Sequence, residues 1–129
     1  MDDEKFVSPQ AVIEDEMKEI IQDGNFELAQ LFSDEGLLLA EVIGSGPIAK
    51  DNLIEIALHF QEIKKMTDVM DETIAVKEIM LEGKGSRKLV FRFFYAFDQL
   101  VILAIVVPPR KAYRKYTNKL MRLVQKVSE

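Results

Sequence analysis

Runs of apolar residues predict five strands and three helices along this chain. The longest run, Leu100 to Val107, holds no polar side chain, and a second β-prone run, Lys88 to Tyr95, comes just before it. A strand that is apolar at every position is covered on both faces, so residues 100–107 are expected at the centre of a sheet. The other strands are predicted at residues 26–32, 37–43 and 73–82, and the helices at 9–24, 51–68 and after residue 109.

The ends of the first helix are marked by residues with known end preferences. Ser8 is expected to accept a backbone amide as N-cap, and Pro9 stands at the first helical position, where no amide is needed. Val7 and Val12 have the spacing of a hydrophobic staple. Gly24 is the expected stop at the carboxyl end.

Turns and strand polarity then predict the topology of the sheet. Residues 33–36 form a tight loop ending in Gly36, and Ala96 to Gln99 turn the chain between the last two strands. The run 73–82 is the most polar of the strands, which is typical of a sheet edge. The order αββαβββα therefore predicts an α+β fold with one five-stranded antiparallel sheet, strand order 2-1-5-4-3. The first and third helices are expected on one face and the second helix on the other.

The second predicted helix is apolar around more than half of its circumference. Asp51 is its expected N-cap. A helix on the surface of a monomer needs only one apolar stripe, so the excess indicates a second burial surface, most simply another chain. The apolar positions are Leu53, Ile54, Ile56, Ala57, Leu58, Phe60, Ile63 and Met66.

Charge is distributed unevenly along the chain, whose formal net charge is -5. Residues 1–23 hold eight acids against Lys5 and Lys18, a balance of -6, and residues 110–129 hold seven bases against Glu129, a balance of +6. The two ends are electrostatically complementary, so the first and third helices are expected side by side.

Composition limits the class of protein. The 129 residues suffice for one domain, and the absence of cysteine excludes disulfides and thiolate metal sites. The acidic start is unlike a signal peptide, and the longest apolar run is too short to span a bilayer, which takes roughly 20 residues. We therefore expect a single cytoplasmic domain over residues 1–129, with no cofactor and no membrane span.

Side chains that could carry chemistry have simpler structural interpretations. His59 is the only histidine and has no nearby ligand partner, so a structural role is favoured over a metal or catalytic one. Residues 44–46, Gly-Ser-Gly, lack the lysine-threonine pair of a phosphate loop. Phe91, Phe93 and Tyr95 share one side of a strand and are expected to face a covering helix rather than to stack on nucleic acid. No enzyme activity is predicted.

The basic third helix is the strongest candidate for binding an acidic partner, such as nucleic acid, a membrane surface or a protein. The favoured interpretation is nevertheless a charged outer face balanced by the acidic first helix. The candidate residues are Arg110, Arg114, Lys115, Lys119 and Arg122.

The whole pattern resembles a roadblock domain, the type found in roadblock dynein light chains and in bacterial or archaeal regulators of Ras-like GTPases. The resemblance covers residues 8–127. It rests on the N-terminal helix, the hairpin FELAQLFSDEGLLLAEVIG, the long apolar helix, the meander ending in LVILAIVV, and the last amphipathic helix. It implies a roadblock/longin/profilin-like sandwich.

The resemblance also implies partners. Second helices would pack together and third strands would pair edge to edge, either in a homodimer or with a related roadblock protein. By position, the dimer contacts would be Ile56, Phe60, Ile63, Ile74, Val76 and Glu78.

Such a dimer would be a non-enzymatic regulatory or scaffold module that binds a small Ras-like GTPase and modulates its GTP hydrolysis. The alternative is a small-ligand or nucleic-acid binding domain that acts through the basic C-terminal helix.

Overall fold

The computed structural model describes residues 8–44, 50–70 and 76–129. Three helices and five strands follow one another in the predicted order, with a single 3-10 turn at Lys84–Ser86. The elements are α1 (Pro9–Gly24), β1 (Leu28–Ser33), β2 (Leu38–Ile43), α2 (Lys50–Met70), β3 (Glu78–Glu82), β4 (Lys88–Ala96), β5 (Gln99–Val107) and α3 (Arg114–Val127).

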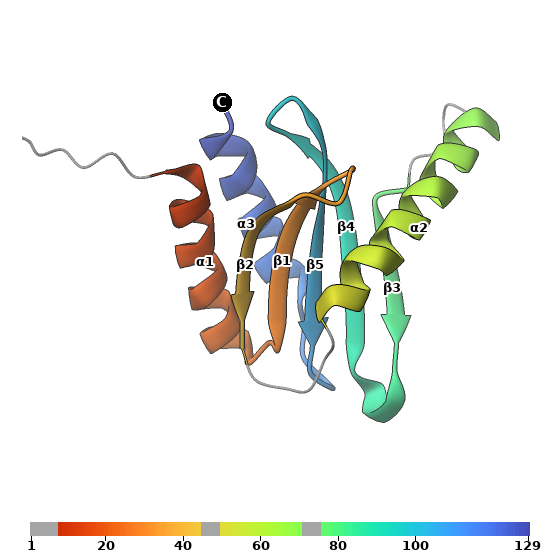
Figure 1. Cartoon of the computed structure of the whole chain (residues 1–129). Coiled ribbons are helices and arrows are strands. Elements are labelled where there is room, and N and C mark those ends of the chain that lie inside the picture. The colour runs from red at the N-terminus through yellow and green to blue at the C-terminus, as the bar shows by residue number, and fades with distance from the viewer. Residues whose placement is uncertain (1–7, 45–49, 71–75) are drawn as a thin grey trace, which may run out of the picture.

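The five strands form one antiparallel sheet in the order β2-β1-β5-β4-β3, which confirms the predicted topology. Figure 1 shows α1 and α3 together on one face of this sheet and α2 on the other. The strand β5 pairs with β1 on one side and with β4 on the other, and its residues 101–107 are all buried. The continuous apolar run therefore occupies the centre of the sheet, as expected.

Two short turns connect the hairpins. Gly36, with φ of 88°, ends the loop between β1 and β2, as predicted. The β4–β5 turn places two residues, Phe97 and Asp98, at φ of 55° and 59°. Two consecutive left-handed residues match the right-handed twist of the flanking strands. The side chain of Phe97 packs against the core, which helps hold a bulky residue in this conformation.

The start of α1 confirms its prediction, whereas its end corrects one. The Ser8 hydroxyl accepts a hydrogen bond from the backbone N–H of Ala11 at 3.1 Å. At the other end Asn25, not Gly24, adopts the left-handed conformation, with φ of 56°. Gly24 is needed for space instead, because a Cβ there would lie 2.6 Å from the Phe26 ring. Val7, the proposed partner of the staple, lies outside the described residues.

Two further boundaries differ from the predictions. The helix α2 begins at Lys50, so Asp51 lies inside its first turn and is not the cap. The strand β3 begins at Glu78, and the predicted start at Thr73 lies outside the described residues.

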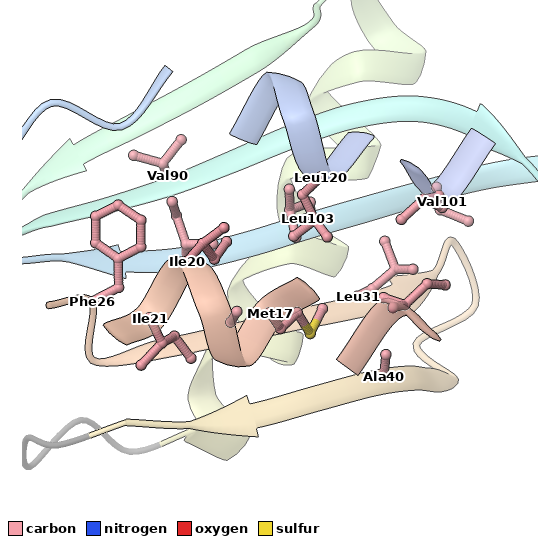
Figure 2. Packing of buried hydrophobic residues seen from close by; sticks show 14 of the residues in the cluster. Met17, Ile20, Ile21, Phe26, Leu31, Ala40, Val90, Val101, Leu103 and Leu120 are labelled. Carbon is pink, nitrogen blue, oxygen red and sulfur yellow. The ribbon is translucent and has the colours of Figure 1, made fainter. Parts of the chain in front are cut away.

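The first core lies between the sheet and the helices α1 and α3. Figure 2 shows Met17 and Ile20 of α1 directed toward Leu31, Leu103 and Leu120. All five side chains are at most 2% exposed. This core therefore fixes both helices against the same face of the sheet.

The second core lies under α2. Leu53 and Ala57 of the helix pack over the sheet, and the Phe60 ring meets the Phe91 ring edge to face, with centroids 5.1 Å apart. Phe93 belongs to the same cluster. The prediction for Tyr95 was wrong, since this side chain is 65% exposed near the end of β4 and no described helix covers it.

Candidate interaction surface

The C-terminal half of α2 exposes a row of apolar side chains. Ile63, Met66, Val69 and Met70, here called the α2 patch, are 46%, 64%, 87% and 77% exposed. By contrast Phe60, one turn earlier, is half-buried against Phe91. Figure 1 shows α2 crossing β4 and β3 so that this half of the helix projects past the sheet. The helix thus has the second apolar surface that its composition predicts.

The strand β3 ends the sheet on the same side. Lys77 O accepts from Phe93 N at 3.0 Å, and Gly83 N donates to Arg87 O, so the odd-numbered positions of β3 pair with β4. Antiparallel ladders alternate, and the even-numbered positions therefore direct their backbone N–H and C=O groups outward. These positions are Glu78, Met80 and Glu82, and no described strand pairs with them.

The predicted dimer contacts occupy different environments. Ile63 belongs to the exposed α2 patch, whereas Ile56 and Phe60 are half-buried and pack against the second core, as does Val76 before β3. Ile74 lies outside the described residues. Ile63 is therefore exposed on α2, whereas Ile56, Phe60 and Val76 contribute at least partly to packing within the chain.

Inside this chain, the side chain of Glu78 makes contacts that the sequence did not predict. Its carboxylate accepts a hydrogen bond from the Tyr113 hydroxyl at 2.6 Å and lies 3.3 Å from a guanidinium nitrogen of Arg114. Arg92 of β4 approaches the other carboxylate oxygen at 3.4 Å. Arg92 also donates to Thr117 and Asn118 of α3, at 2.9 and 2.6 Å. One acid thus ties the edge strand to β4 and to the start of α3.

These contacts change proton affinities. Partial burial, reinforced by the hydrogen bond to Glu78, raises the pKa of Tyr113 above its ordinary value of 10.0. The hydrogen bond with Tyr113, followed by the nearby Glu78 charge, raises the pKa of Arg114. The sequence analysis missed Arg92 and Tyr113. A lone arginine within the apolar run of β4 is the signal that could have identified Arg92.

The predicted basic residues do not form one site. Arg110 lies exposed in the loop before α3, where its φ is 63°, and Arg114 binds Glu78. Lys115 lies over the Tyr116 ring, 5.4 Å from its centroid. Lys119 Nζ lies 3.3 Å from Glu16 Oε2 of α1, which confirms that the acidic and basic helices are neighbours. Arg122 is exposed on the outer face of α3.

Within the described residues, no group of His, Asp and Glu side chains has an arrangement that could hold a metal ion. His59 is exposed on α2. Ser45 and Gly46 of the glycine-serine stretch lie outside the described ranges. None of the helices that the structure describes is long and apolar enough to cross a bilayer.

This arrangement of elements is the roadblock fold. The chain is similar to gliding protein MglB from Thermus thermophilus, with a TM-score of 0.72 and 12% identity over 96% of this chain and 93% of that one. It is similar to Myxococcus xanthus MglB, with a TM-score of 0.76 and 13% identity over 96% and 92% of the two chains.

The Roadblock/LC7 domain from Streptomyces avermitilis also matches, with a TM-score of 0.67 and 16% identity over 88% of this chain and 92% of that one. No protein-family model matches the sequence, and no curated protein matches it. At these identities the likeness establishes the fold.

Proposed function

We propose that this chain, as one domain over residues 1–129, forms a dimer that binds a small Ras-like GTPase in the cytoplasm and acts as its regulatory platform. The observation that carries the proposal is a β3 edge with which no described strand pairs, together with the exposed α2 patch, on a roadblock fold. An exposed strand edge pairs readily with another strand, and large exposed apolar patches mark interaction sites.

Dimerisation joins these two features. Pairing β3 with β3 of a second copy satisfies the outward backbone groups of Glu78, Met80 and Glu82. The same approach brings the two α2 helices together, so that Ile63 and the rest of the α2 patch leave water. The partner chain is this protein itself or a related roadblock protein.

The proposed regulation needs no catalytic side chain from this chain. Arg87 lies 2.7 Å from Glu27, while Arg92 and Arg114 are held by Glu78. Arg110 and Arg122 have no ion pair within the described residues, and both are exposed. Stimulation of GTP hydrolysis would then arise from ordering the GTPase's own switch residues, a shift between its conformations.

The test measures binding of small Ras-like GTPases loaded with GDP or with a non-hydrolysable GTP analogue, and single-turnover hydrolysis of bound GTP. We expect nucleotide-dependent binding to a dimer. Arg110→Ala and Arg122→Ala should weaken binding and turnover together. If either change abolished turnover at saturating protein while affinity stayed intact, an arginine finger would be required. If no GTPase bound in either nucleotide state, the assignment would fail.

The alternative function is binding of a small ligand or nucleic acid through α3. It is favoured by the exposed bases Lys111, Lys115, Arg122 and Lys126 on and before this helix. Retention on DNA that falls steeply with salt, together with no GTPase binding, would select this alternative.

A further inference from the structure

The face formed by α1 and α3 carries two opposite stripes of charge. On α1, Asp15, Glu19 and Asp23 follow one another at one-turn intervals along the helix. On α3 the bases also follow the helical period, and they are Lys115, Lys119, Arg122 and Lys126. Residues spaced by three or four positions lie on one side of a helix. One edge of this face is therefore acidic and the other basic.

Each stripe is electrostatically unfavourable by itself. Like charges one turn apart on a helix repel, and Lys115 also lies at the positive N-terminal end of α3. Within the described part of the chain, Lys119 is the stripe residue with an ion pair, to Glu16. Glu19 and Asp23 line the groove between the helices opposite Lys115, without a contact of ion-pair length among the described residues. Charge of both signs thus remains available to a partner.

The two helices run in opposite directions on the face away from α2, as Figure 1 shows. The Lys119–Glu16 contact fixes their relative height. Because both helices rise about 1.5 Å per residue, Asp15 lies level with the segment between Lys119 and Arg122, and Glu19 lies level with Lys115. The acidic stripe and the basic stripe therefore lie at matching heights.

We infer that the α1–α3 face is a second self-association surface, on which another copy of this chain docks with its acidic helix over the basic helix of the first. Two copies that dock face to face by a two-fold rotation have their axis in the plane of the interface. An axis parallel to the helices, along the groove between them, places α1 of one copy over α3 of the other at equal height. The parallel axis places Asp15 of one copy against Arg122 of the other, and repeats every contact in reverse. A two-fold axis in the same plane but perpendicular to the helices would place the acidic stripes of the two copies against each other. Electrostatic repulsion therefore favours the axis parallel to the helices.

This contact is independent of the proposed β3 pairing. The α2 patch and the α1–α3 face lie on opposite sides of the sheet, and a chain can use both at once. A dimer joined through β3 would then pair with a second dimer through α1 and α3. Loss of one contact leaves the other intact, so the two proposals fail separately.

The test uses the whole chain in sedimentation velocity, at concentrations up to about 1 mM, in low and in high salt. The wild type should show a doubling of mass that weakens at least about tenfold in high salt, because exposed charges are screened. Two variants then distinguish docking of two copies through this face from other causes of a salt-sensitive doubling of mass. One replaces two bases of the α3 stripe by acids, Lys115→Glu with Arg122→Glu, and the other replaces two acids of the α1 stripe by bases, Asp15→Lys with Glu19→Lys.

Each variant alone should lose the salt-sensitive step, with an affinity at least about tenfold weaker. An equal mixture of the two should recover it, because acid then meets base on both helices. The control, Glu35→Lys with Glu55→Lys, makes the same charge change as the second variant but away from this face, and should behave as wild type. Circular dichroism checks that each variant is folded.

The inference is overturned if the wild type shows no salt-sensitive doubling, or if the mixture of folded variants stays dissociated. It is also overturned if the salt-sensitive doubling is absent while the chain binds vesicles that contain phosphatidylserine through the basic stripe.

Discussion

The two edge strands of the sheet, β2 and β3, differ in whether their outward-facing backbone groups are occupied. On β2, the carboxylate of Glu14 in α1 accepts a hydrogen bond from the backbone N–H of Glu41 at 3.0 Å. The helix α1 packs beside this strand, so part of the edge is occupied. On β3 the outward groups of Glu78, Met80 and Glu82 have no neighbouring strand among the described residues.

The two edge strands also differ in the regularity of their pairing with the neighbouring strand. The pairing of β1 with β2 shifts where Leu31 faces Ala40 but Phe32 faces Leu38, which leaves Leu39 without a counterpart. The pairing of β3 with β4 runs without a shift from Glu78 to Glu82. Bulges and attached side chains discourage the addition of another strand, whereas a regular edge invites it. Within the described residues, one edge of the sheet is therefore blocked and the other is available.

The largest expected effect comes from proline on the free edge. Met80→Pro removes an outward N–H and leaves the β3–β4 ladder intact, so the fold should persist. Pairing of β3 with a second copy should weaken at least about a hundredfold, measured by sedimentation equilibrium.

Glu41→Pro is the matched change on the blocked edge, where it removes the N–H bound by Glu14. Self-association should then be unaffected. If Glu41→Pro dissociated the chain and Met80→Pro did not, the roles of the two edges would be reversed.

The next effect concerns the anchor of β3. Glu78→Ala leaves the guanidinium of Arg92, whose side chain is 15% exposed, without its carboxylate. Because the pair is only partly buried, we expect the free energy of unfolding to fall by about 2 kcal/mol, less than for a fully buried pair. Urea denaturation followed by circular dichroism measures it.

Glu78→Gln keeps an acceptor for the Tyr113 hydroxyl and should lose about half as much. An unchanged unfolding midpoint in Glu78→Ala would show that these ion pairs do not stabilise the edge strand.

A smaller effect is expected from uncovering β2. Glu14→Ala removes the acceptor for Glu41 N–H, at a cost of about 1 kcal/mol. It should also produce concentration-dependent aggregation that Met80→Pro does not suppress, because the new contact uses the other edge. Light scattering against concentration measures this, with Glu14→Gln as the control that retains an acceptor. Absence of aggregation would mean that the bulge alone protects β2.

The smallest effect is a pH dependence at β3. The raised pKa of Tyr113 means that the fold favours the neutral phenol, so its contribution is present below pH 10.0 and is lost as pH rises through the folded value. Tyr113→Phe should lower the free energy of unfolding by about 0.5 kcal/mol near neutral pH. The substitution should also reduce the fall in the free energy of unfolding at alkaline pH. An equal decline in both proteins would remove Tyr113 from this role.

The topology could be predicted from the sequence because it follows from local pattern. Leu100 to Val107 must be covered on both faces, and the polar run ending at Glu82 suits an edge, so few strand orders remain. The ends of helices were harder. Gly24 was expected to reverse the chain, but the ring of Phe26 packs where its Cβ would be, and this contact is visible only in three dimensions.

The environment of Glu78 could not be predicted for a similar reason. Its partners come from β4 and α3, at sequence separations that no periodicity reveals. Tyr95 shares the parity of Phe93, but it lies closer to the end of the strand, beyond the cover of α2. Pattern assigns a side chain to a face, whereas the path of the covering helix across the sheet decides whether it is buried.

The two-residue turn between β4 and β5 has a consequence for synthesis of the chain. The strand β5 contains an uninterrupted apolar segment from Leu100 to Val107, the kind of segment that aggregates when it is exposed. When this segment leaves the ribosome, β4 has just emerged, joined to it by the turn at Phe97 and Asp98. The other neighbour, β1, emerged earlier. Both of its neighbours thus exist before it does, so pairing can begin as soon as the segment emerges, while α3 follows to cover it.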